Sequence, residues 1–199
     1  ISMSIGAYMN MNRLTLNKLG IAAFLHDLGK LYIPKELLNK PGKLTLHEME
    51  IMKTHAREGY LHLTNKIQIS DDIRTAVLDH HERPDGTGYP LGKKSSEISR
   101  MGSIISIADV YDALTSDRPY RSGKSPSEAI EYIMAKVNSQ FSEKIVNAFL
   151  KKIAPYPVGT LVELSNNTTG IVMVNYTDAV LRPKVKVIME YDEKVEPYV

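Results

Sequence analysis

Two adjacent histidines, His80 and His81, end a largely apolar segment that begins at Ile73. A loop rich in glycine and proline follows at residues 83–90 and carries an aspartate and a tyrosine. Neighbouring histidines rarely serve packing, because imidazole is polar and a buried ring nitrogen needs a hydrogen-bond partner. Imidazole is also the commonest protein ligand for metal ions. The pair therefore predicts a metal site and raises the question of its other ligands.

Four further residues of metal-binding types fall within or at the ends of expected apolar helices: His26, Asp27, His55 and Asp109. Polar side chains at such positions are costly unless they are paired or bound to an ion. Adjacent helical residues point about 100° apart, so a His-Asp or His-His doublet addresses two sides of one ion or two neighbouring ions. With the histidine pair, the set holds four imidazoles and two carboxylates, too many for one tetrahedral zinc ion. It favours a multinuclear site of six-coordinate metals.

Such a site suits the hydrolysis of phosphate esters. Asp27 could bridge two metal ions about 3.5–4 Å apart, a spacing at which the ions activate a water and stabilise the leaving oxygen. Lys30 follows one turn later, where its ammonium could contact a phosphate oxygen or the attacking water. Arg118 and Arg121 lie three residues apart in a basic loop and could bind a second phosphate. The residues alone therefore predict a metal-dependent phosphohydrolase for a small phosphodiester.

Three segments closely resemble the HD-GYP family, a subset of the HD superfamily of helical metal-dependent phosphohydrolases. They are the His-Asp-x-Gly-Lys run at residues 26–30, the His-His-Glu-x-x-Asp-Gly-x-Gly-Tyr-Pro run at 80–90 and the Asp-x-x-Asp-Ala-Leu-Thr-Ser-x-Arg-Pro-Tyr-Arg run at 109–121. The resemblance covers roughly residues 14–150, in order and with the usual spacing. It implies hydrolysis of the bacterial second messenger cyclic di-GMP to pGpG, and often on to GMP. It also implies two or three divalent metal ions, iron or manganese.

Carried over by position, the resemblance assigns metal ligation to six residues: His26, Asp27, His55, His80, His81 and Asp109. It assigns catalytic roles to Asp27 and Lys30, and substrate contacts to Lys30, Tyr89, Arg118 and Arg121. The loop at residues 88–90 would line the substrate entrance. Asp85 is interpreted as a partner that orients a histidine rather than as a ligand.

One departure from the family pattern leaves alternatives open. Family members usually supply a further histidine, and in three-metal forms a glutamate, from an upstream helix, but residues 1–25 contain neither type. The chain opens at Ile1 within an apolar helical pattern, which favours a truncated start and a regulatory domain upstream. If those ligands are absent, the chain is instead a catalytically weak or inactive module that binds cyclic di-GMP or a GGDEF-type partner through residues 88–90. A third alternative is an HD phosphohydrolase for another nucleotide.

The elements that must position these residues are mainly helices. A dense apolar stretch at residues 16–25 leads into the His-Asp pair, and a long apolar helix at 97–114 carries Asp109. The capping-box pattern at residues 45–48 predicts one helix that runs to about residue 62 and carries His55. Ser70 is expected to cap the helix that ends at the histidine pair.

The pattern changes after residue 157, where β-branched residues alternate with others in three segments separated by turn residues. The sequence therefore predicts a mainly α fold, an HD-type helical bundle with a small C-terminal antiparallel β module. We expect an HD-GYP catalytic domain at residues 1–153 and the β module at 154–199.

The composition of the chain argues against several classes of partner and of metal site. The 25 Lys and Arg against 23 Asp and Glu give a formal charge of +2, too small to predict DNA or a membrane surface as a partner. Without cysteine, any metal must be held by nitrogen and oxygen ligands. No apolar run approaches the roughly 18 residues of a membrane span, so the expected location is the cytoplasm. The expected partners are a cyclic dinucleotide and a GGDEF-domain protein, and a homodimer is left open.

Overall fold

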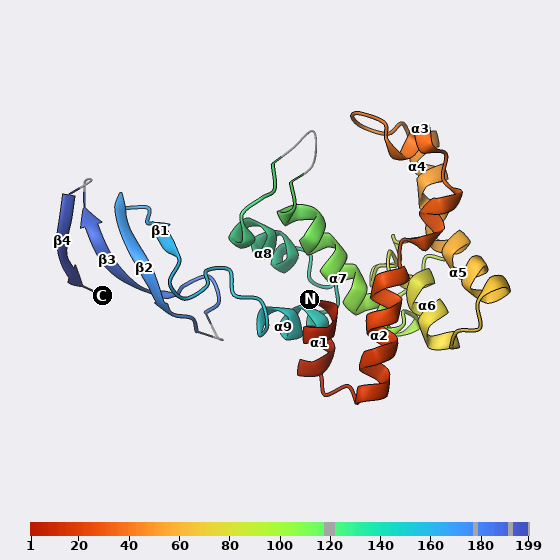
Figure 1. The fold of residues 1–199 in the computed structure, drawn as a ribbon, viewed down its shortest axis with the longest axis horizontal. Coiled ribbons are helices and arrows are strands. Elements are labelled where there is room, and N and C mark those ends of the chain that lie inside the picture. The colour runs from red at the N-terminus through yellow and green to blue at the C-terminus, as the bar shows by residue number, and fades with distance from the viewer. Residues whose placement is uncertain (118–121, 177–178, 191–192, 199) are drawn as a thin grey trace.

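The computed structural model describes residues 1–117, 122–176, 179–190 and 193–198. Helices make up its first three quarters, and a small antiparallel sheet follows at the left of Figure 1. This arrangement confirms the predicted fold class, mainly α with a C-terminal β module. The helices are α1 (Ser2–Tyr8), α2 (Arg13–Leu25), the 3-10 turn η1 (Leu28–Tyr32), α3 (Lys35–Leu38), α4 (Leu46–Lys53), α5 (His55–Lys66), α6 (Asp71–Asp79), the 3-10 turn η2 (Ser95–Glu97), α7 (Arg100–Thr115), α8 (Pro126–Ala135) and α9 (Glu143–Leu150).

Helix α7 is the central element of the helical part (Figure 1) and contacts α1, α2, α6, α8 and α9. Residues 101–108, in its first half, are buried except for Ser103, as is typical of a helix inside a core. Ile104, Ile105 and Ile107 are at most 2% exposed and join the main hydrophobic core. Phe149 from α9 is fully buried and packs edge-on against Tyr111 of α7. The core therefore fixes α7, which carries Asp109, against its neighbours.

The helix predicted to open at Thr45 is two helices. Its capping box is confirmed, since Glu48 N donates to Thr45 Oγ1 and Thr45 N donates to Glu48 Oε2. The chain then breaks at Thr54, whose amide and hydroxyl both bond to Ile51 O, and α5 starts at His55. The prediction of one helix was wrong, because these bonds tighten the last turn of α4. Ser70 precedes α6 as expected but makes no side-chain capping bond.

The sheet is a four-stranded antiparallel meander in the order β1-β2-β3-β4. Its inner face buries Val172 and Val187, while a turn at Asn167, with a φ of 62°, joins the first two strands. Leu181, which precedes β3, packs against the core of the helical part. The strands are β1 (Leu161–Glu163), β2 (Thr168–Val174), β3 (Lys184–Glu190) and β4 (Glu193–Tyr198).

Within the described ranges, no helix has both the length and the apolar character needed to cross a membrane. The division into domains at residues 153 and 154 stays a prediction.

Candidate metal centre

Three of the predicted histidine ligands lie at the ends of helices. His26 and His80 follow the last residues of α2 and α6, and His55 follows the break after α4. The last carbonyls of a helix lack intrahelical partners, so a side chain that donates to them also caps the helix. Each ring does so through Nδ1, to the carbonyl three residues earlier: His26 to Ala23 O at 2.8 Å, His55 to Met52 O at 2.7 Å and His80 to Val77 O at 2.6 Å.

These backbone bonds determine which nitrogen of each of the three rings carries the proton. Because a carbonyl only accepts hydrogen bonds, Nδ1 carries the proton, and in the neutral ring Nε2 is left with a free lone pair. Burial lowers the pKa of His55, His80 and His81, which keeps those rings neutral. Burial also acts to lower the pKa of His26, but the carboxylates of Asp109 and Asp27 outweigh it, and the net pKa is raised.

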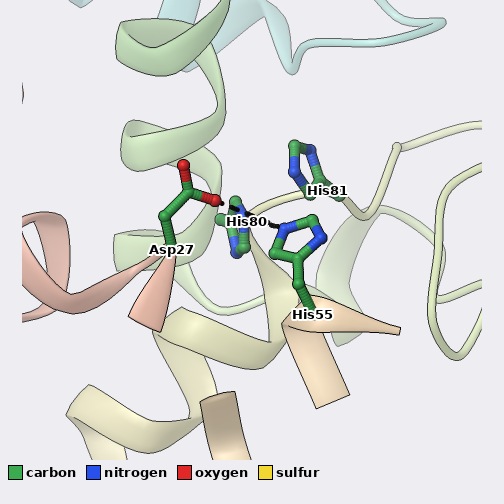
Figure 2. A group of neighbouring side chains, drawn as sticks. All are labelled: Asp27, His55, His80 and His81. Atoms are coloured by element: carbon green, nitrogen blue, oxygen red, sulfur yellow. Dashed lines mark hydrogen bonds and ion pairs between the residues drawn. The ribbon is translucent and has the colours of Figure 1, made fainter. Parts of the chain in front are cut away.

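The Nε2 atoms of the three rings and two carboxylates lie close together, with Asp27 between His26 and His55. His55 Nε2 lies 3.2 Å from His80 Nε2 and 3.5 Å from Asp27 Oδ1. His26 Nε2 lies 3.5 Å from Asp27 Oδ2 and 3.7 Å from Asp109 Oδ1. Figure 2 shows Asp27, His55 and His80 directed toward one another with His81 beside them, and one ligand atom from each of the four lies within 4.8 Å of the others.

This donor set fits a divalent cation. Two neutral imidazole lone pairs that face each other at 3.2 Å repel unless a proton or a cation lies between them. His26 Nε2 is buried and has no hydrogen-bond partner in the described part of the chain, which is expensive for a polar atom. Burial acts to raise the pKa of Asp109, but its contact with His26 outweighs this and lowers the net pKa, so the carboxylate is charged. Nitrogen and oxygen donors of this kind suit iron, manganese or zinc.

Gly29 explains how the His-Asp pair reaches His55. A Cβ at this position would lie 1.8 Å from His55 O and 2.5 Å from Gly59 N. Only glycine therefore lets the backbone of η1 lie directly against α5. The contact holds Asp27, two residues earlier, beside the His55 ring. Lys30, also in η1, forms an ion pair with Asp27 Oδ2 and is 42% exposed, at the open side of the site.

The loop after the histidine pair folds back over it. Gly88 lies so close that a Cβ would stand 2.4 Å from Arg83 N and 2.6 Å from His81 O. Tyr89 N donates to His81 O at 3.2 Å, and the Tyr89 ring packs 4.7 Å from the His81 ring, centroid to centroid. Burial, together with the charges of Asp109 and Asp27, raises the pKa of Tyr89, so its hydroxyl stays protonated.

A family model described as the HD domain matches residues 1–145, nearly three quarters of the sequence. The chain belongs to the HD domain family. The recognition drawn from the three motifs is thereby confirmed. The His-Asp pair of the first motif, His26 and Asp27, lies at the junction of α2 and η1.

Known HD domain proteins are similar to this chain in sequence and in fold. It is 42% identical over 176 residues to a cyclic di-GMP phosphodiesterase of Pseudomonas aeruginosa, covering 88% of this chain and 42% of that protein. The fold matches an HDG"Y"P protein of Bdellovibrio bacteriovorus with a TM-score of 0.61 at 20% identity, covering 74% of this chain and 47% of the other. It also matches a cyclic GMP-AMP-specific phosphodiesterase of Vibrio cholerae with a TM-score of 0.57 at 20% identity, covering 74% and 40%. The chain thus spans less than half the length of each of these proteins.

The HD domain brings together most of the predicted site residues. Asp27, His55, His80 and His81 form one compact group. His26 joins this group through Asp27, and Asp109 lies beside His26. Lys30 and Tyr89 border the group. Arg118 and Arg121 lie outside the described residues. The interpretation of Asp85 as a partner of a histidine was wrong: its Oδ1 accepts from Thr87 N at 2.9 Å and from Thr87 Oγ1 at 2.7 Å, a local turn at the surface.

Sequence reasoning gave no role to two buried carboxylates beside the histidine pair. Asp79 is fully buried and Glu82 is 2% exposed. The available signal was their position, since an acidic residue stands directly on each side of His80 and His81. Both bind groups from residues 91–99 rather than the metal-site atoms.

Proposed function

We propose that this HD domain is a metal-dependent phosphodiesterase that hydrolyses cyclic di-GMP. The observation that carries the proposal is the close approach of the Nε2 atoms of His26, His55 and His80 to one another and to the carboxylates of Asp27 and Asp109. The 42% identity to a cyclic di-GMP phosphodiesterase supports this substrate rather than an unrelated nucleotide.

The six ligands proposed above would hold two or three divalent ions, iron or manganese. Ions at this position would supply Lewis acidity for a phosphoryl oxygen and for the attacking water. The carbonyls of Ala23, Met52 and Val77 keep three ligand rings oriented. Lys30 would bind a non-bridging phosphate oxygen, and Tyr89 offers a ring on which a guanine base can stack. Arg118 and Arg121 are proposed to bind the second phosphate.

Metal removal and restoration test this proposal. Protein treated with a chelator should lose hydrolysis of cyclic di-GMP, and anaerobic addition of Fe²⁺ or Mn²⁺ should restore it, with two or more ions bound per chain. Metal content and product formation are measured in the same sample, with cyclic GMP-AMP as a parallel substrate because one solved structural neighbour is specific for it. Faster turnover of cyclic GMP-AMP would replace the proposed substrate. No turnover of either compound by metal-loaded protein would contradict the enzyme proposal.

A Lys30→Met variant is expected to hydrolyse cyclic di-GMP about 100-fold more slowly while it still binds metal. The reason is that loss of one preorganised donor to a developing oxyanion costs about 10²–10³ in rate. Steady-state kinetics with metal analysis check the result. Lys35→Met is the matched control, since Lys35 is exposed, lies five residues further on and forms no ion pair among the described residues. A loss of metal equal to the loss of rate would instead assign Lys30 to the support of Asp27.

The second candidate function is a catalytically weak module that binds cyclic di-GMP or a GGDEF-type partner through residues 88–90. It is motivated by the absence of histidine and glutamate from residues 1–25. Binding of cyclic di-GMP without turnover by metal-loaded protein would favour it. The GGDEF partner and a homodimer stay predictions.

A further inference from the structure

Two buried carboxylates flank the histidine pair without joining the metal site. Asp79 directly precedes His80 and is fully buried, and Glu82 directly follows His81 and is 2% exposed. A buried carboxylate is costly unless it is well paired and hydrogen-bonded, and apolar residues of similar volume often stabilise a fold as well or better. Two such groups at adjacent sites therefore call for a role other than stability.

Lys93 binds both carboxylates. Its Nζ donates to Asp79 Oδ1 at 2.7 Å, and its backbone N donates to Glu82 Oε2 at 2.9 Å. Leu91 N adds a bond of 2.7 Å to Glu82 Oε1. The segment that leaves the Tyr89 loop is thus tied to both sides of the histidine pair. We call Asp79, Glu82 and Lys93 the Lys93 latch.

The latch also reaches helix α7. Asp79 Oδ2 accepts from Ser99 N at 2.8 Å, and Ser99 is the N-cap residue of α7. Gly102, in the first turn of α7, lies against the base of the Asp79 side chain, since a Cβ there would stand 2.7 Å from Asp79 Cβ. Asp79 therefore connects the histidine pair, the Tyr89 loop and the helix that carries Asp109.

His81 is the ligand that depends most on this connection. The rings of His26, His55 and His80 are each anchored to a backbone carbonyl through Nδ1. Within the described residues, neither ring nitrogen of His81 makes a hydrogen bond. Its ring instead packs against the rings of His80, Tyr89 and His55, at 4.0, 4.7 and 5.0 Å between centroids, and the Tyr89 amide bonds to His81 O. The side of the His81 ring that faces away from the other histidines is thus supported by the loop, and the loop is held by the latch.

We propose that Asp79 and Lys93 are positioning residues that fix His81 and Tyr89 relative to the metal centre. The inference rests on the metal site of the proposed function but not on the identity of its substrate. Removal of the Lys93 ammonium releases the loop from Asp79, so the His81 ring loses its support and samples orientations that do not bind metal. Residues that orient metal ligands typically contribute about 10–100-fold to metal affinity or activity.

A Lys93→Met variant tests the proposal, because it removes the ammonium and keeps the backbone bond to Glu82. The probe is Mn²⁺, titrated calorimetrically into the metal-free full chain. We expect the dissociation constant of the weakest site to rise at least about tenfold, and KM for cyclic di-GMP to rise with it. Lys94→Met is the matched control: it removes a neighbouring exposed lysine that forms no ion pair within the described residues, and it should bind Mn²⁺ as the parent does.

The double variant Asp79→Asn with Lys93→Met distinguishes a loss of ligand positioning from a loss of stability of the fold. It removes the buried charge that Lys93→Met leaves unpaired, while the amide oxygen can still accept from Ser99 N, so the melting temperature should recover toward that of the parent. We expect Mn²⁺ affinity to stay at least about tenfold weakened. Recovery of affinity together with stability would overturn the proposal, as would parent-like Mn²⁺ binding by Lys93→Met or no Mn²⁺ binding by the parent. A parent that binds Mn²⁺ but does not hydrolyse cyclic di-GMP would contradict the proposed function alone.

Discussion

A His80→Ala variant is expected to lose bound metal and to hydrolyse cyclic di-GMP about a thousandfold more slowly. His80 is fully buried, and its Nε2 lies 3.2 Å from His55 Nε2, at the point where the ligands meet. Metal ions contribute several kcal/mol to phosphoryl transfer, and each 1.36 kcal/mol is about tenfold in rate. Elemental analysis of anaerobically purified protein and steady-state kinetics measure the two losses. The variant His80→Ala with His81→Ala should show no activity above background.

The matched control is His47→Ala, because His47 is exposed on α4 and no role was assigned to it from the sequence. Its metal content and turnover should equal those of the parent. Thermal unfolding of the metal-free proteins shows whether a loss in His80→Ala comes from the site or from the fold. Parent-like catalysis in the double variant would remove the basis for the metal centre.

The sequence was sufficient to predict which residues lie together at the candidate site, because their residue types are improbable as packing. His80, a polar residue that ends an apolar helix, needs a partner, and the motif spacing identified the segments that supply it. The predicted apolar helices also formed, since α7 is buried along its first half and carries Asp109 into the site. The fold class followed from the same periodicity, with alternation after residue 157 giving the sheet.

What the sequence did not reveal depends on contacts between distant residues or on backbone geometry. The break at Thr54 is a matter of local hydrogen bonds that compete with helix continuation, and the break gives His55 its bond to Met52 O. The Lys93 latch joins residues 14 positions apart through a loop whose path no periodicity specifies. Asp85 was misinterpreted because an aspartate in a glycine-rich loop serves its own turn as readily as a distant histidine.

A Gly29→Ala variant is expected to lower the free energy of unfolding by about 3 kcal/mol and the melting temperature by about 6–12 °C. The added Cβ would stand 1.8 Å from His55 O, and the obstacle is backbone rather than a side chain that can rotate. Helix α5 and η1 must therefore separate, which moves Asp27 away from the His55 ring. Thermal and urea unfolding of the metal-free chain measure the loss of stability, and Mn²⁺ titration measures the accompanying loss of affinity.

Gly20→Ala is a control in which the free energy of unfolding should not fall. Gly20 lies inside α2, and its nearest obstacle is the flexible Met3 side chain, with Sδ 3.1 Å from the added Cβ. Alanine in a helix interior is favoured over glycine by about 1 kcal/mol, so this variant should be at least as stable as the parent once Met3 moves. Equal stability of Gly29→Ala and Gly20→Ala would mean that η1 can leave α5 at little cost. The close backbone contact would then not be what holds Asp27 at the metal centre.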